Sequence, residues 1–177
     1  DIGIEWIYPD DEQSYIACNI TAQQISERLA GQNGRITAVY ITSPDYLGNM
    51  QDISAIARAC HESGALLSVD NAHGAYLKFM PTSAHPMDLG ADICCDSAHK
   101  TLGVITGGAY LHISASAPAV LAERAKASFS VFGTSSPSYL ILQSLDAANG
   151  TTEAFRNELR TFLPEADSLK AKLAAHG

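Results

Sequence analysis

Short apolar runs in the middle of the chain lead into polar residues that are suited to chemistry. The run 66–69 ends at the carboxylate of Asp70, and the run 93–95 leads into the sequence DSAHKT, which contains Lys100. Short apolar runs with such boundaries are typical of buried strands. Ligands bind at the carboxyl ends of the strands in an open α/β sheet, so we expect these polar residues to lie at a binding edge.

Lys100 and Asp70 are the side chains with the clearest chemical potential. A lysine that attacks a carbonyl group must be partly buried so that its amine can lose a proton. We therefore expect Lys100, in the sparsely charged sequence AHKTL, to be partly buried; the alternative is a surface lysine in a loop. An unpaired carboxylate at the end of a buried strand is costly. This cost favours a cationic partner for Asp70 over a role in capping a nearby loop.

The elements that must position these residues are indicated by local signals. Thr21 and Gln24 form a capping box, which predicts a helix that ends near Gly31. A second amphipathic helix is predicted to begin at Asp52 and to end at Gly64. The expected strands are 2–8, 36–42, 66–69, 93–95 and a further run between 106 and 113.

The alternation of strands and helices predicts βαβ units and a mostly parallel sheet. A short helical stretch is expected near 85–89, and the last third of the chain is expected to be helical. One of its helices should run from Pro137 to about Gly150. A final helical pattern spans 152–173, and Pro164 should kink or divide it. The chain length suits a single domain with its own core.

Composition and charge exclude several classes of partner. Eleven basic and nineteen acidic residues give a net charge of −8, which argues against nucleic acid because phosphate binding needs clustered Lys and Arg. The sequence shows no basic run suited to a membrane surface, no signal-peptide pattern and no apolar stretch of membrane length. The four cysteines form no CxxC pair and are expected to be reduced, which predicts a cytoplasmic location.

Three motifs resemble the large domain of pyridoxal-phosphate (PLP) enzymes of fold type I, and most of all the Orn/Lys/Arg decarboxylase group. They are DNAHG at 70–74, SAHKT at 97–101 and TSSPSY at 134–139, and the sequences TSP at 42–44 and YLG at 46–48 fit the same group. The resemblance implies a three-layer α-β-α sandwich with a mostly parallel sheet, the fold of the aspartate aminotransferase large domain. It implies that residues 1–177 are part of the PLP-binding major domain, incomplete at the N-terminus. The phosphate loop, the ring-stacking residue and the C-terminal small domain are then expected outside this chain.

The activity implied by the resemblance is PLP-dependent decarboxylation of a basic amino acid (lysine, ornithine or arginine) through an aldimine on Lys100. Asp70 would hold the pyridinium nitrogen, Ala72 would pack against one face of the ring, and His73 would reach the phenolic oxygen. The implied catalytic residues are Lys100, Asp70 and His73. The implied cofactor-binding residues are Asp70, Ala72, His73, Ser97, His99, Lys100, Thr134 and Ser135.

Several of these assignments carry alternatives. The hydroxyl of Ser97 is spaced to bond the phosphate, whereas His99 would lie near the phosphate or the substrate carboxylate, or else face solvent in a loop. Relatives use the segment 134–136 to reach the phosphate of the neighbouring subunit's site, at a helix N-terminus that favours anions. This use implies at least a homodimer with shared active sites. The same segment would also suit a cap on the helix that begins at Pro137.

The chain departs from many members of the resembled group at two positions. Asn71 stands where many relatives carry Glu, so a charge is lost beside Asp70. Gly103 stands where many relatives carry proline, which predicts a looser loop after Lys100.

Other functions fit parts of the pattern. Within the same fold, an aminotransferase, a desulfurase or an aldolase would use the same Asp, His and Lys residues. A metal hydrolase is a second class, but the spacing matches no closed zinc pattern and Lys100 would repel a cation, so no metal is expected. Its ligands would be Asp70, His73, Asp92 and His99. A third reading is a non-catalytic piece of the fold that binds no cofactor by itself.

Overall fold

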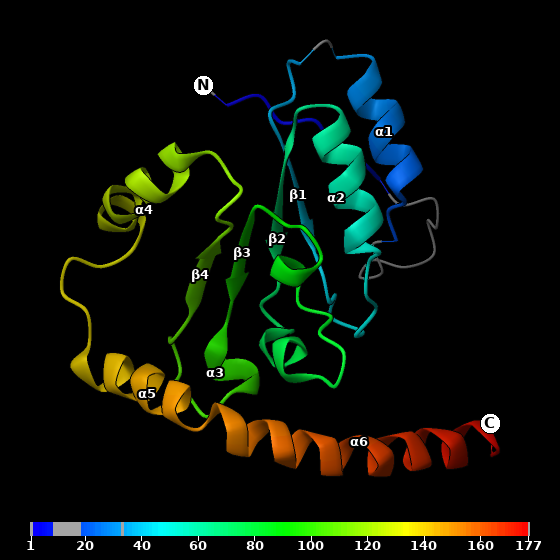
Figure 1. Cartoon of the computed structure of the whole chain (residues 1–177), viewed down its shortest axis with the longest axis vertical. Coiled ribbons are helices and arrows are strands. Elements are labelled where there is room, and N and C mark those ends of the chain that lie inside the picture. The colour runs from blue at the N-terminus through cyan, green and yellow to red at the C-terminus, as the bar shows by residue number, and fades with distance from the viewer. Residues whose placement is uncertain (1, 9–18, 33, 177) are drawn as a thin grey trace.

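The computed structural model describes residues 2–8, 19–32 and 34–176 (Figure 1). Helices and strands alternate through the first half of the chain, and three helices follow the last strand. In chain order the elements are α1 (Ala22–Ala30), β1 (Ala38–Thr42), α2 (Ile53–Glu62), β2 (Leu66–Asp70), the 3₁₀ turns η1 (Ala75–Phe79) and η2 (Pro86–Asp88), β3 (Ile93–Asp96), α3 (Ala98–Thr101), β4 (Tyr110–Ile113), α4 (Ala119–Phe132), α5 (Tyr139–Gly150) and α6 (Thr152–Ala174).

The four strands form one sheet in the order β1-β2-β3-β4. The strands β1, β2 and β3 are parallel, whereas β4 runs antiparallel to β3. Asp70 lies opposite Thr42 of β1 and Cys95 of β3, so the carboxyl ends of the three parallel strands meet at one edge. The predicted α/β fold with a mostly parallel sheet is confirmed.

The helices α1 and α2 begin where the sequence predicts. The amide of Gln24 donates to Thr21 Oγ1 at 3.2 Å, and the amide of Thr21 donates to Gln24 Oε1 at 2.8 Å, which completes the capping box. Asp52 Oδ1 accepts from the amide of Ala55 at 3.0 Å at the start of α2. Both caps satisfy backbone donors that have no partner inside the helix.

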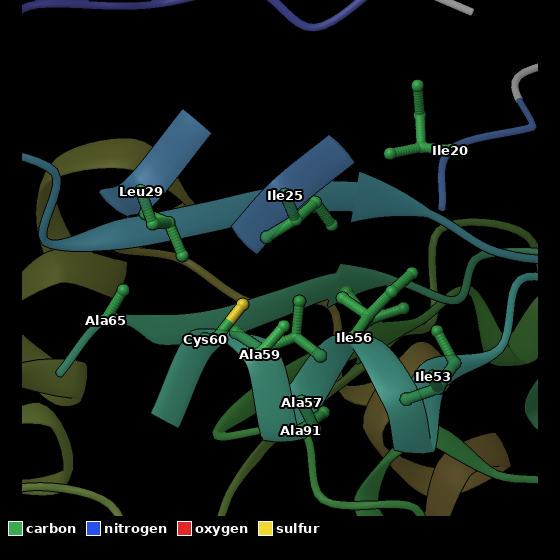
Figure 2. Packing of buried hydrophobic residues seen from close by; sticks show 12 residues of the cluster. Ile20, Ile25, Leu29, Ile53, Ile56, Ala57, Ala59, Cys60, Ala65 and Ala91 are labelled. Atoms are coloured by element: carbon green, nitrogen blue, oxygen red, sulfur yellow. The ribbon is translucent and has the colours of Figure 1, made fainter. Parts of the chain in front are cut away.

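The hydrophobic core lies between these two helices and one face of the sheet. Ile25 of α1 and Ile56 of α2 are fully buried, and they pack in one cluster with Leu67 and Val69 of β2 (Figure 2). Each fully buried side chain of this size stabilises the fold by about 1.5–3 kcal/mol. This packing anchors β2, and therefore the strand end that carries Asp70.

Strand alternation gives the two faces of the sheet different surroundings. Val69 is opposite Cys94, and both are buried on the face that α2 covers. Side chains of the opposite face are more accessible: Tyr40 is 65% exposed and Leu111 is 39% exposed. Asp70 and Cys95 belong to this open face, because side chains alternate along a strand.

Two expectations for the chain were wrong. Residues 2–8 form no strand; Ile2 is 92% exposed, and Glu5 instead pairs with Arg28 of α1 at 2.9 Å. An alternating pattern needs a neighbouring strand, and the segment pairs with none of the described strands. Of the two outcomes expected at Pro164, a kink or a division, the division is wrong, because α6 continues through Pro164 from Thr152 to Ala174.

Three of the four cysteines lie among the described residues. Cys60, Cys94 and Cys95 are free, and Cys18 lies outside the described residues. Among the helices of the described chain, none combines the length and the hydropathy needed to cross a bilayer.

Candidate active site

Asp70 ends β2 on the open face of the sheet, and its two oxygens are held by different donors. Oδ1 accepts from the amide of Ala72 at 3.0 Å, and Oδ2 accepts from the hydroxyl of Tyr40 at 3.0 Å. The thiol of Cys95 lies 3.9 Å from Oδ1. Burial and the hydrogen bond to Asp70 raise the pKa of Tyr40 to about 12, so the phenol keeps its proton and remains a donor. The carboxylate is thus oriented before any ligand arrives.

Lys100 and His73 meet at the same edge. Lys100 lies in α3, directly after β3, and its Nζ is 3.1 Å from His73 Nε2. The rings of Tyr46 and His73 contact each other in a T-shaped arrangement, with ring centroids 4.9 Å apart. The expectation that Lys100 is partly buried was wrong: its side chain is exposed, because α3 places it at the open rim of the sheet. The structure therefore brings together the lysine and the histidine that the sequence singled out.

Ser97 and His99 lie on either side of the first residue of α3. Ser97 stands at the N-cap of α3, but its hydroxyl makes no capping hydrogen bond. His99 Nδ1 lies 2.9 Å from the carbonyl oxygen of Gly108, which can only accept, so Nδ1 carries a proton and donates it. The alternative of a solvent-facing His99 was wrong, because the residue is half-buried. Its ring is held by the hydrogen bond to Gly108, which lies in the loop before β4.

Thr134 and Ser135 lie apart from these residues. The segment that joins α4 and α5 is remote from α3 in Figure 1, and Thr134 Oγ1 accepts from the amide of Ser136 at 3.0 Å. The prediction that this segment caps the next helix was wrong: α5 begins at Tyr139, and its N-cap is Ser138. The fold of one chain does not bring these hydroxyls to Lys100.

The sequence analysis missed Tyr40, which donates to Asp70, and the buried Asp96. The carboxylate of Asp96 is buried at the end of β3, on the face opposite to Asp70, and it accepts from Asn71, His85 and His112 and, more weakly, from the Cys94 thiol at 3.7 Å. Asn71 Nδ2 lies 2.6 Å from Oδ1, and the Nε2 atoms of His85 and His112 lie 3.0 and 2.9 Å from Oδ2. Burial alone would raise the pKa of Asp96, but these hydrogen bonds outweigh it and hold the pKa well below its usual range.

The Asp96 network links the two sequence motifs. Asn71 follows Asp70, and Asp96 precedes Ser97, so one hydrogen bond joins the loop after β2 to the loop after β3. The neutral amide of Asn71 suits this place, because a second carboxylate here would face the ionised Asp96. Asp96 directly precedes SAHKT, so its position was visible in the sequence. No pattern in the sequence indicated that His85 and His112 would contact it.

Gly74 is required by the tight loop that follows Asp70. Its amide donates to the carbonyl oxygen of Asn71 at 2.8 Å. A Cβ atom at this position would overlap Asn71 Oδ1 and would lie 2.7 Å from Pro44 Cδ. A larger residue would therefore displace the turn that carries His73.

His85, Asp96 and His112 have the residue types of a metal site, and their ligand atoms lie within 4.8 Å of one another. The hydrogen bonds indicate a different role. The amide of Met87 donates to His85 Nδ1 at 3.3 Å, which places the His85 proton on Nε2, the nitrogen that faces Asp96. The lone pair that a metal would need at Nε2 is therefore occupied by a proton.

The four ligands of the metal-hydrolase alternative do not lie together in the structure. They are Asp70, His73, Asp92 and His99. Asp92 precedes β3, at the opposite end of the strand from His99. Its Oδ2 accepts from the amide of Leu67 at 2.8 Å and lies 2.9 Å from His61 Nε2. The carboxylate ties α2 to the sheet instead of joining Asp70 and His73.

A cavity of about 200 Å³ lies on the covered side of the sheet, beside Asp96. His112 and Tyr110 of β4 line one side of it, and Phe79 and Phe155 line another. The face of the sheet separates this cavity from Asp70, since Asp96 and Asp70 point in opposite directions. The cavity is therefore not the space next to Lys100 and His73.

The chain matches the family model described as Orn/Lys/Arg decarboxylase, major domain, over residues 5–175. It is 32% identical over 174 residues to the uncharacterized protein YaaO of Bacillus subtilis, which covers 95% of this chain and 36% of that protein. It is 32% identical over 147 residues to an arginine decarboxylase of Halalkalibacterium halodurans, which covers 81% of this chain and 29% of that enzyme. The chain thus spans about a third of the length of the curated relatives that it matches.

Solved structures show the same fold. Pyridoxamine-pyruvate aminotransferase from Mesorhizobium loti matches with a TM-score of 0.56 and 26% identity, over 84% of this chain and 39% of that chain. The methionine gamma lyase CalE6 from Micromonospora echinospora matches with a TM-score of 0.57 and 24% identity, over 75% of this chain and 34% of that chain. The fold is that of the fold type I PLP enzymes, as the sequence motifs imply.

The first prediction concerns the buried carboxylate. Asp96→Asn should lower the free energy of unfolding by about 3 kcal/mol or more at pH 7, because both histidines lose an ionised acceptor. Folding lowers the pKa of Asp96, so its contribution is present above the unfolded-state pKa of about 3.9 and is lost as the pH falls through the folded-state pKa. Denaturant titrations from pH 7 downward should show the gap between wild type and variant shrinking below about pH 4.

Asp167→Asn on α6 is the matched control, because the Asp167 side chain is 76% exposed. It should change the free energy of unfolding by less than about 0.5 kcal/mol. A gap between wild type and Asp96→Asn that stays constant from pH 7 into the acid range would contradict the proposed ionisation of Asp96.

Proposed function

The chain belongs to the Orn/Lys/Arg decarboxylase family, as a part of its major domain, and on this premise we propose that the protein is a PLP-dependent decarboxylase of a basic amino acid. The substrate would be arginine, lysine or ornithine. Two arginine decarboxylases, from Halalkalibacterium halodurans and Bacillus subtilis, are 32% and 31% identical to it over 147 residues. The observation that carries the proposal is the meeting of Lys100, His73 and the strand end of Asp70 at one edge of the sheet.

The residues at this edge fit PLP. The cofactor has an aldehyde, a cationic ring nitrogen, a phenolic oxygen and a phosphate. The edge offers an exposed amine on Lys100 and an oriented carboxylate on Asp70. It also offers the hydroxyl of Ser97, which makes no capping hydrogen bond to α3. Three buried polar atoms of the two motifs, Asn71 Oδ1, His73 Nδ1 and Thr101 Oγ1, have no hydrogen-bond partner among the described residues. Unsatisfied groups of this kind are costly unless a ligand or water completes them.

Each residue would act on a different part of the cofactor and substrate. When bound, PLP supplies an electron sink for the bond that loses carbon dioxide. Asp70 would pair with the ring nitrogen and keep it protonated. Lys100 would bind the aldehyde carbon, would be displaced from it by the substrate amino group, and would later displace the product amine. His73, 3.1 Å from the Lys100 amine, would hold a proton close to the reacting atoms.

The remaining contacts would orient the cofactor. Ala72 would present a small side chain to one ring face, and Ser97 would donate its hydroxyl to the phosphate. His99 has its Nδ1 proton committed to Gly108, so Nε2 is the nitrogen left for the phosphate or the substrate carboxylate. Either group would be held only by a protonated Nε2.

The proposal includes sites shared between two subunits. Thr134 and Ser135 are exposed and remote from Lys100 in their own chain, and their segment precedes α5. In a homodimer these hydroxyls would reach the phosphate in the partner's site. Their exposure and their distance from the rest of the site are the observations that support this arrangement.

The test of the function is product analysis with the full-length protein. Arginine, lysine and ornithine are each supplied with PLP, and carbon dioxide and the amine are measured against the keto acid that an aminotransferase would form. Lys100→Ala should abolish both products, and borohydride reduction of the wild type should attach the cofactor to the peptide that contains residues 98–101. Lys126→Ala, an exposed change on α4, is the control and should retain activity. Labelling of another lysine would disprove the role of Lys100.

Asp70→Asn should leave the cofactor attached but slow the reaction. Deleting one partner of a buried ion pair costs roughly 3–5 kcal/mol. Because Asp70 is half-exposed, we expect the loss of its charge to cost about 3 kcal/mol or less. We expect kcat to fall by about 100-fold, since each tenfold step corresponds to about 1.4 kcal/mol. Single-turnover kinetics with saturating PLP measure this step, and wild-type turnover in the variant would refute the pairing.

Subunit mixing tests the shared site. A Lys100→Ala subunit is combined with a subunit that carries alanine at 134–136. In a mixed dimer, one site would receive an intact Lys100 and intact partner hydroxyls. Random pairing would then restore up to about a quarter of wild-type activity. Full activity of the 134–136 variant by itself would show that these hydroxyls serve no site.

A further inference from the structure

Tyr40 is a side chain of β1 that the sequence motifs do not include, yet it touches Asp70. Its hydroxyl donates to Asp70 Oδ2 at 3.0 Å. In the sheet register Thr42 lies opposite Asp70 and Tyr40 lies opposite Ser68, so Tyr40 is the diagonal neighbour of Asp70. Diagonal neighbours on one face of a sheet are within reach of a long aromatic side chain. The contact therefore follows from the register of β1 and β2.

The donors around Asp70 are not equivalent. The amide of Ala72 holds Oδ1 from the loop at 3.0 Å, and this contact belongs to the backbone. The Cys95 thiol, at 3.9 Å from Oδ1, is a weak and distant donor. The phenol of Tyr40 approaches the other oxygen, Oδ2, from the neighbouring strand. Loss of this hydroxyl would leave Oδ2 without its donor from the described residues.

We propose that Tyr40 is a positioning residue that acts on the cofactor through Asp70. Its hydrogen bond fixes the plane of the carboxylate and stabilises the ionised form, so the proton shared by Asp70 and the ring stays on the ring nitrogen. The inference rests on the proposed function, because it assigns Tyr40 a role only toward a ring that Asp70 holds. Tyr40 itself contacts Asp70 and not the reacting atoms.

The physical basis is the preference of a hydrogen bond for one protonation state. A donor to a carboxylate favours the charged form, and its removal makes the carboxylate a stronger competitor for a nearby proton. A ring nitrogen that shares its proton withdraws electrons less strongly. Tyr40 is 65% exposed, so solvent weakens the effect, and the expected change is modest.

The test uses the full-length protein loaded with PLP that carries ¹⁵N in the ring. The ring-nitrogen chemical shift in Tyr40→Phe should move from the protonated toward the unprotonated range. We expect kcat to fall by roughly three- to tenfold with little change in KM, because the altered group acts on the chemical step and not on substrate binding. Tyr8→Phe is the matched control: it removes a hydroxyl from a tyrosine that is 74% exposed, and it should leave the shift and kcat unchanged.

A second measurement addresses the contact without the cofactor. The pKa of Tyr40 is raised to about 12, by burial first and then by Asp70. In protein with ¹³C-labelled tyrosine, the Tyr40 signal should therefore titrate at lower pH in Asp70→Asn than in wild type. An unchanged titration would overturn the proposal by showing that the two groups are not coupled.

The outcomes separate this inference from the proposed function. A wild-type protein that takes up no PLP overturns both. A wild type that binds PLP and decarboxylates, combined with a Tyr40→Phe variant whose ring-nitrogen shift and kcat equal those of wild type, overturns the role of Tyr40 alone. Circular dichroism of Tyr40→Phe excludes unfolding as the cause of any loss.

Discussion

The buried carboxylate of Asp96 is the interaction on which the arrangement of the site depends. It accepts from side chains of the loop after β2, of the N-cap of η2 and of β4, at distances of 2.6–3.0 Å. A buried charge is tolerated only when it is paired and hydrogen-bonded, so each donor is needed for the stability of the others. Because Asn71 lies within DNAHG and Asp96 directly precedes SAHKT, the same network holds the loop of His73 and the helix of Lys100 in register.

The pleat of the sheet divides structural from chemical roles. At the ends of β2 and β3, Asp70 and Cys95 point to the open face, whereas Asp96 points to the face that α2 covers. The covered face supplies packing and a closed hydrogen-bond network. The open face presents an oriented carboxylate, with donors on both oxygens, beside an exposed lysine. This separation lets a rigid core position reactive groups that remain accessible to a ligand.

Several parts of the molecule could be predicted from signals confined to a few consecutive residues. The capping box of Thr21 and the cap at Asp52 were predicted correctly, because both bonds join residues three apart in the sequence. The apolar runs before Asp70 and Ser97 predicted strands for the same local reason. The membership in the decarboxylase family was also readable from the sequence, since DNAHG and SAHKT are contiguous motifs.

Contacts between distant parts of the chain were decided only by the tertiary structure. Tyr40 and Asp70 are 30 residues apart, and Asp96 is separated from Asn71, His85 and His112 by 25, 11 and 16 residues. No local propensity encodes such pairs; they follow from the register of neighbouring strands and from the path of the loops between them. The same reason explains the N-terminal segment, because alternation makes a strand only where the fold supplies a partner edge. The sequence thus determined which residues carry the chemistry, and the packing of the sheet determined which other side chains hold them in place.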